Sequence, residues 1–134
     1  MANDGKTDDI TKRFIAALQG AEKSKDVGPL VALFAADAEL ESIAKPDVAR
    51  GTDGARQFWS DYLSAFETIR SEFGLVVEGN GAAVLEWTSA GALPTGKSVK
   101  YRGVSVLELG GELVKRFCTY YDTTPFVVPT PPKA

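Results

Sequence analysis

Hydrophobic residues recur at helical spacing in the first half of the chain. From Asp8 to about Ala21 they fall three and four positions apart, with acidic residues in the first turn, which predicts an amphipathic helix. A second, short helix is predicted within residues 27–37. A third is predicted over residues 54–66, where Thr52 or Asp53 can cap the start and aromatic side chains form one face. Residues 37–43 predict a strand, and residues 45–54 a loop.

The second half of the chain has the alternating pattern of strands. Three turns divide it: Gly79-Asn80-Gly81, the Pro-Thr-Gly of residues 94–96, and Gly110-Gly111. Glycine next to asparagine is a strong hairpin signal, so we expect consecutive antiparallel strands. Helices followed by such a meander predict an α+β fold. We expect one domain over residues 1–126 and a Pro-rich extended tail over residues 127–134.

The segment GALPTGKS, residues 91–98, matches the phosphate-binding pattern G-x-x-x-x-G-K-[ST] at every specified position. In a phosphate-binding loop a strand enters the turn and a helix leaves it, so that the helix N-terminus faces the phosphate. Here the residues that follow are rich in β-branched and aromatic side chains and predict a second strand. The match is therefore interpreted as a hairpin turn, and no nucleotide is expected to bind at Lys97.

Length and composition are those of an ordinary globular domain. The chain has 134 residues, 44% hydrophobic and 25% charged, and no apolar run long enough to cross a membrane. Its start is polar and acidic, unlike a signal or transit peptide, so a cytoplasmic location is expected. A net charge of −3, without a basic block, does not favour nucleic-acid binding.

The sequence has no histidine and one cysteine, Cys118. A Ser-His-Asp triad and the usual zinc sites are therefore excluded, and we expect no cofactor. Any proton chemistry has to use Asp, Glu, Tyr, Lys, Cys or water.

Four segments carry a resemblance to a known superfamily: LVALFAADAEL at 30–40, the helix start GTDGARQFW, ALPTGKSVKYRGVSVLEL at 92–109, and YYD at 120–122. Over residues 8–126 the chain resembles NTF2-like proteins, in particular the SnoaL-like and limonene-epoxide-hydrolase-like branches. The resemblance implies a cystatin-like cone, in which a curved antiparallel sheet wraps around N-terminal helices and leaves an apolar pocket. Because this fold supports many activities, it does not by itself assign one.

The catalytic residues of these relatives are not found here. The limonene epoxide hydrolase positions correspond to Glu86, Thr88, Thr119, Leu40 and Ser42. The ketosteroid isomerase positions, whose chemistry is a standard example of pKa tuning, correspond to Phe14, Ser42 and Ser105. None of these has the residue type that the relative uses.

Strand alternation predicts which side chains face the inside of the cone. It places Glu86 there as the one inward carboxylate, which could act as a general acid or base or serve as a satisfied structural group. The expected ligand-binding residues, with helix residues that could equally be core, are Phe14, Trp59, Tyr62, Thr88, Tyr101, Ser105, Phe117, Thr119 and Tyr121.

The same alternation predicts an apolar outer face. Exposed apolar patches mark interfaces, and related proteins pair through this face, so the resemblance implies a homodimer. The residues expected at that interface are Trp87, Val104, Val106 and Tyr120.

Two functions remain open from the sequence. The first is a protein that binds a small hydrophobic molecule and has no assignable catalytic set. The second is a cofactor-independent isomerase, cyclase, lyase or hydrolase that acts on a small hydrophobic substrate with Glu86 as the acid or base.

Overall fold

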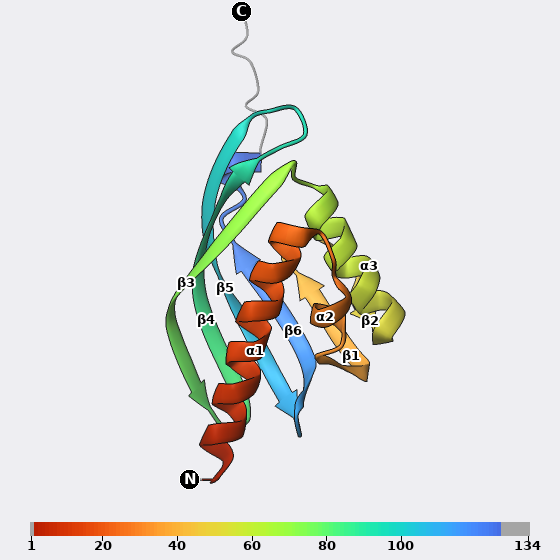
Figure 1. The fold of residues 1–134 in the computed structure, drawn as a ribbon, viewed down its shortest axis with the longest axis vertical. Helices are drawn as coiled ribbons and strands as arrows, with labels where there is room; N and C mark the ends of the chain where they lie inside the picture. The colour runs from red at the N-terminus through yellow and green to blue at the C-terminus, as the bar shows by residue number, and fades with distance from the viewer. Residues whose placement is uncertain (1, 127–134) are drawn as a thin grey trace, which may run out of the picture.

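The computed structural model describes residues 2–126, with side chains from residue 9 onward. Figure 1 shows the helices on one side of a long, curved sheet. The elements are α1 (Ala2–Ser24), α2 (Gly28–Val31), β1 (Phe34–Ser42), β2 (Ala49–Arg50), α3 (Gly51–Ser64), β3 (Thr68–Gly79), β4 (Ala82–Ala92), β5 (Ser98–Gly110), β6 (Leu113–Tyr121) and a 3₁₀ turn, Thr124–Phe126. The expected tail, residues 127–134, lies outside the described residues.

The sheet has six strands in the order β2-β1-β6-β5-β4-β3. The strands from β3 to β6 form the predicted antiparallel meander, whereas β1 pairs with β6 in parallel, so the sheet is mixed. Irregular register in β3, between Phe73 and Val76, interrupts the ladder, and such bulges bend and twist a strand. The α+β cone fold predicted from the sequence is confirmed.

The helices pack on the concave face of this sheet, α1 against β3 and α3 against β1 (Figure 1). Ile10, Phe14 and Leu18 lie on one stripe of α1 because they are four residues apart, and all three are buried. Phe14 contacts Trp59 of α3 and Phe117 of β6, with ring centroids 6.1 and 5.7 Å apart. The main core is therefore an aromatic cluster between the two helices and the sheet.

Several element boundaries differ from those predicted. Helix α1 continues to Ser24, beyond the predicted end near Ala21. Helix α2 is a single turn, and β1 begins at Phe34, within the segment predicted as helix. The chain is a strand and not a helix here because it pairs with β6: the N–H of Val114 donates to the carbonyl of Leu33, and Phe34 pairs with Val114. The predicted loop also contains the short strand β2.

The three predicted hairpin turns are confirmed. Asn80 and Gly81 have positive φ of 55° and 72° and join β3 to β4, as a two-residue hairpin turn requires. Residues 93–97 join β4 to β5, and the N–H of Leu93 donates to the carbonyl of Lys97. No helix follows Lys97, whose side chain is exposed, so GALPTGKS lacks the architecture of a phosphate-binding loop.

The predicted faces of β4 were wrong. Ala83, Leu85, Trp87 and Ser89 are buried, whereas Val84, Glu86 and Thr88 are exposed on the convex face. The reason is the register set by loop 93–97, which pairs Trp87 with Gly103 and Glu86 with Val104. Directly paired residues share a face, and Gly103 lies between Tyr101 and Ser105 on the buried face of β5, so Trp87 must point inward. Trp87 is therefore not part of an outer interface, and Glu86 is not inside the cone.

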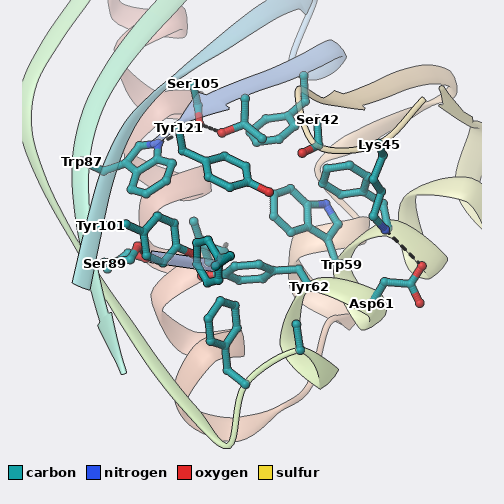
Figure 2. A pocket seen from close by; sticks show the side chains of 18 of the residues that line it. Ser42, Lys45, Trp59, Asp61, Tyr62, Trp87, Ser89, Tyr101, Ser105 and Tyr121 are labelled. Carbon is teal, nitrogen blue, oxygen red and sulfur yellow. Dashed lines mark hydrogen bonds and ion pairs between the residues drawn. The ribbon is translucent and has the colours of Figure 1, made fainter. Parts of the chain in front are cut away.

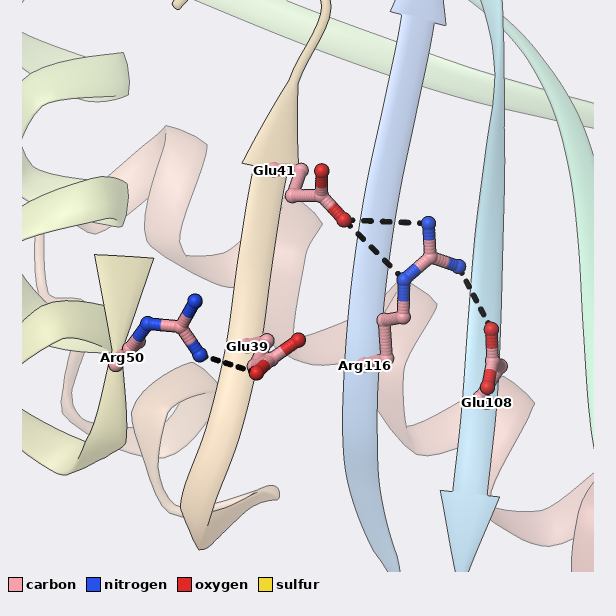
Figure 3. Close-up of polar contacts among 5 residues, drawn as sticks. All are labelled: Glu39, Glu41, Arg50, Glu108 and Arg116. Carbon is pink, nitrogen blue, oxygen red and sulfur yellow. Dashed lines mark hydrogen bonds and ion pairs between the residues drawn. The ribbon is translucent and has the colours of Figure 1, made fainter. Parts of the chain in front are cut away.

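Charged side chains connect the strands on the convex face (Figure 3). Arg50 of β2 pairs with Glu39 of β1. Arg116 of β6 bridges Glu41 of β1 at 3.2 Å and Glu108 of β5 at 2.7 Å. The hydrogen bond that Arg116 donates to Glu108 is the main reason why the pKa of Arg116 is raised. These pairs tie β2, β1, β6 and β5 together on the side away from the helices.

None of the helices in the described part of the chain combines the length and apolar character needed to cross a bilayer.

Candidate functional site: an aromatic pocket inside the cone

A pocket of about 220 Å³ lies on the concave side of the sheet, between α3 and strands β3 to β6 (Figure 2). Its lining comes from α1 and α3, the segment after α3, all four meander strands, the end of β1 with the segment after it, and the C-terminal 3₁₀ turn. The lining residues are Leu18, Ser42, Lys45, Phe58, Trp59, Asp61, Tyr62, Ala65, Phe66, Ser71, Phe73, Trp87, Ser89, Tyr101, Ser105, Phe117, Thr119, Tyr121 and Phe126.

Aromatic rings form most of the pocket wall. The Trp59 ring contacts those of Tyr62 and Phe117 at centroid distances of 6.0 and 5.0 Å. On the sheet side, Tyr101 lies 5.5 Å from Trp87 and 5.6 Å from Tyr121. Because these rings also contact one another, the wall is held in shape before any ligand arrives.

One polar atom in this wall has no partner. The indole N–H of Trp59 is buried and makes no hydrogen bond, unlike every other buried side-chain nitrogen or oxygen among the described residues. Figure 2 shows this nitrogen on the side of the ring toward Ser42 and Lys45. A buried donor without an acceptor costs about 1–3 kcal/mol, so such groups are uncommon in folded proteins.

The mouth of the pocket carries an ion pair. The Nζ of Lys45 lies 3.3 Å from Oδ2 of Asp61, and the amide of Gln57 donates to Oδ1 of Asp61 at 2.7 Å. The Gln57 hydrogen bond, and then Lys45, lower the pKa of Asp61. Lys45 also lies 5.7 Å from the centre of the Phe58 ring. Both charged groups are half exposed and can meet solvent or a ligand at the rim.

A first buried polar network lies on the sheet. The indole N–H of Trp87 donates to Oγ of Ser105 at 2.9 Å, and Ser105 is 2.9 Å from the hydroxyl of Thr119. Trp87, Ser105 and Thr119 come from β4, β5 and β6, so this network crosses three strands.

A second network surrounds a buried carboxylate, Glu22 of α1, whose exposed fraction is 5%. Tyr62 Oη donates to Oε2 of Glu22 at 2.6 Å. Ser71 donates to the Glu22 carboxylate twice: its backbone N–H to Oε1 at 2.8 Å and its hydroxyl to Oε2 at 2.6 Å. Ser71 Oγ is also 2.5 Å from Oγ of Ser89. Burial raises the pKa of Tyr62 and of Tyr101 well above the ordinary value, with a further contribution from neighbouring Glu22 in both.

The structure brings most of the predicted ligand-binding residues together. Those that line the pocket are Trp59, Tyr62, Tyr101, Ser105, Phe117, Thr119 and Tyr121. Phe14 is 1% exposed and belongs to the core behind the pocket. Thr88 and Glu86 lie on the convex face, because the predicted alternation of β4 was shifted by one residue. The acid or base role of Glu86 rested on its predicted burial, so the structure removes its basis.

Two groups of functional residues were missed by sequence reasoning. Trp87 and Ser89 were missed because the buried face of β4 was predicted wrongly. Leu85 and Trp87, the large apolar residues of that strand, indicated the buried side. Glu22 was missed because the helix was predicted to end near Ala21. Its position four residues after Leu18 and eight after Phe14 places it on the buried stripe of α1, which was the available signal.

The described side chains contain no cluster of three or more His, Cys, Asp or Glu that could hold a metal ion.

The family model for the SnoaL-like domain matches residues 11–117. No curated protein matches the chain at a significant level.

Solved structures with the same fold cover nearly the whole chain. An NTF2-like protein from Anabaena variabilis ATCC 29413 is 16% identical, with 90% of this chain and 92% of that one covered and a TM-score of 0.81. A candidate SnoaL-like polyketide cyclase from Jannaschia sp. CCS1 is 14% identical, with coverage of 93% and 94% and a TM-score of 0.79. SalBIII, an epoxide hydrolase/cyclase-like enzyme in salinomycin pyran ring formation, is 19% identical, with coverage of 93% and 97% and a TM-score of 0.77. At these identities the likeness establishes the fold.

Proposed function

The chain belongs to the SnoaL-like domain family, and we propose that it binds a small, largely aromatic molecule in the pocket inside its cone. The observation that supports this most is a ligand-sized pocket walled by aromatic rings, with a few polar groups converging on it. Concave, mostly apolar pockets of this composition are the usual form of small-molecule sites.

The size of the pocket limits the ligand. At about 220 Å³ it is larger than an engineered cavity of about 150 Å³ that holds benzene. It is smaller than the roughly 300–1,000 Å³ of typical drug-sized sites. A molecule of one or two rings therefore fits best, and larger ligands need the rim at Lys45 and Ala65 to open.

The unpartnered indole N–H of Trp59 adds a chemical preference. A ligand with a carbonyl, ether or hydroxyl oxygen near this group supplies the acceptor that the protein lacks. Polyketide cyclization and pyran ring formation, which are associated with two of the structural neighbours, both involve oxygenated carbon skeletons. An oxygenated ring compound is therefore the favoured ligand class.

The test is calorimetric titration of the protein with naphthalene and its oxygenated derivatives. We expect saturable binding at a 1:1 ratio. Ala65→Trp should abolish it, because Ala65 is exposed at the rim of the pocket and a large ring there blocks entry without disturbing the core. Thr88→Trp, on the convex face, is the matched control and should bind normally. Failure of all these compounds to bind the wild type, or binding unaffected by Ala65→Trp, would contradict the proposal.

A further inference from the structure

Glu22 is the one charged side chain among the buried residues that the structure describes. Among the described residues, its hydrogen-bond donors are the hydroxyls of Tyr62 and Ser71 and the N–H of Ser71, with no lysine or arginine among them. Burying a carboxylate is costly unless hydrogen bonds compensate, and bonds to a charged acceptor are the stronger kind. A carboxylate held this way, beside a pocket, fixes the direction of every hydroxyl around it.

The protons of the network can be assigned by counting. A hydroxyl has one proton to donate, and Ser71 donates its proton to Glu22. The 2.5 Å contact between Ser71 and Ser89 then requires Ser89 to be the donor. Tyr62 also gives its proton to Glu22. The hydroxyl protons of Tyr62, Ser71 and Ser89 are therefore all directed toward Glu22 and not into the pocket.

This arrangement determines what the pocket wall can offer a ligand. Tyr62, Ser71 and Ser89 all line the pocket, and with their protons committed their oxygens have only lone pairs left. The Tyr101 hydroxyl interacts with Ser89 and Tyr62; it has one proton, so it can donate to only one of these oxygens and leaves the lone pairs of the other, and its own, for a ligand. Tyr62 stays protonated because burial raises its pKa, so it does not become a charged acceptor itself. This end of the pocket thus accepts hydrogen bonds, whereas the Trp59 N–H can only donate one.

We propose that Glu22 is a specificity-determining residue that makes this end of the pocket an acceptor site, selecting ligands that present a hydroxyl or amino hydrogen to Tyr62 and Ser89. The proposal rests on the proposed function, since it concerns the same pocket. Glu22 acts through Tyr62 and Ser71 and does not line the pocket itself.

The experiment compares three probes of nearly equal size: 2-naphthol, which has a donor, 2-methoxynaphthalene, which has only an acceptor, and naphthalene, which has neither. Affinities are measured calorimetrically at pH 7. One additional neutral hydrogen bond corresponds to a preference for 2-naphthol over the ether of roughly three- to tenfold in the wild type. Naphthalene separates this effect from the contribution of the rings.

Glu22→Gln tests the role of the carboxylate. The glutamine amide donates to Tyr62 and frees the tyrosine proton to point into the pocket, so the preference for 2-naphthol should fall below about twofold. Tyr62→Phe, which keeps the Glu22–Ser71 bonds, should have the same effect on preference and covers the case in which Glu22→Gln fails to fold. Glu86→Gln, an exposed carboxylate on the convex face, is the matched control and should keep the full preference.

The outcomes separate the two proposals. If no probe binds the wild type, the proposed function fails. If all three bind equally well, or if both Glu22→Gln and Tyr62→Phe fold and keep the wild-type preference, the pocket binds ligands but the role of Glu22 is wrong.

Discussion

At the scale of single residues, the buried network around Glu22 ties ligand recognition to stability. Tyr62 is both a wall of the pocket and a donor to the carboxylate, at 2.6 Å. Losing one partner of a buried hydrogen bond leaves the other with an uncompensated desolvation cost. Glu22 keeps two bonds from Ser71 if Tyr62 is removed, so the network tolerates that loss better than the loss of Ser71.

The tyrosines of this network predict how stability depends on pH. Burial raises the pKa of Tyr62 and Tyr101 in the folded state above the value of about 10 for an unfolded chain. The folded state then holds these protons longer than the unfolded state does. Their contribution is fully present below pH 10 and is lost as the pH rises above 10 toward the folded-state pKa.

We therefore expect the free energy of unfolding of the wild type to fall steeply above about pH 10. The free energy of unfolding of Tyr62→Phe should fall less steeply there, and below pH 9 the curves of the two proteins against pH should be parallel. Urea denaturation followed by circular dichroism between pH 7 and 11.5 measures both slopes, and tyrosinate absorbance shows when the side chains ionise. Equal slopes above pH 10 would mean that Tyr62 is not desolvated in the folded protein.

The residues of the site could be predicted from sequence only where one pattern decided their position. Trp59 and Tyr62 lie on the aromatic face of α3, and the pattern of that helix indicated the face directly. Glu86 was placed inside the cone by alternation alone, and alternation does not say which of the two faces is buried. Glu22 became a site residue only through Tyr62 and Ser71, which lie 40 and 49 positions away in the chain, and no local pattern contains that contact.

At the scale of the elements, the hairpins were predictable because their turns are encoded locally. Asn80-Gly81 has the conformation that a two-residue turn demands. The faces of the strands follow from the register that each turn sets, and loop 93–97 shows how one residue of loop length exchanges the two faces. The parallel pairing of β1 with β6 joins distant segments, so local pattern could not reveal it.

The close contact of β5 with its neighbours at Gly103 gives a prediction at this scale. A Cβ at Gly103 would collide with the carbonyl of Tyr120 and lie 2.7 Å from the Trp87 ring, so backbone and a packed ring would have to move. Gly103→Ala should lower the free energy of unfolding by about 1–3 kcal/mol, the usual cost of overpacking. It should also weaken probe binding, because Trp87 lines the pocket.

Gly110, on the same strand, is the matched control. The atoms nearest to a Cβ there belong to the side chain of Lys115, which is flexible and can turn away. Gly110→Ala should therefore change the free energy of unfolding by much less than Gly103→Ala. Thermal and urea denaturation of the two variants measure the difference, and equal destabilisation would contradict the assigned packing.

At the scale of the whole molecule, the two faces of the sheet are suited to different partners. The concave face forms the pocket, and the convex face carries an outer stripe of directly paired residues across four strands: Val77, Val84, Val106 and Cys118. Beside the stripe, Val104 pairs with Tyr120, which is 46% exposed. We propose that a second copy of the chain covers this surface, because a two-fold symmetric dimer needs one self-complementary patch. Val77 and Val84 belong to this outer surface, where the sequence analysis had placed Trp87.

This proposal predicts the effect of a charge within the stripe. Val84 is 39% exposed, so lysine fits there in a monomer, but in the dimer it would bury two charges against apolar surface. Burying a side chain of this size contributes about 1.5–3 kcal/mol, so Val84→Lys should raise the dimer dissociation constant by at least tenfold, or about 1.4 kcal/mol. Thr88→Lys, four residues away on the same strand and face but outside the stripe, is the control.

Light scattering over a micromolar concentration series measures both variants. A wild type that stays monomeric at high micromolar concentration would contradict the dimer, as would equal behaviour of the two variants. Because the pocket opens on the opposite face, monomeric Val84→Lys should still bind 2-naphthol with wild-type affinity, and a loss of binding would show instead that the pocket depends on the assembly.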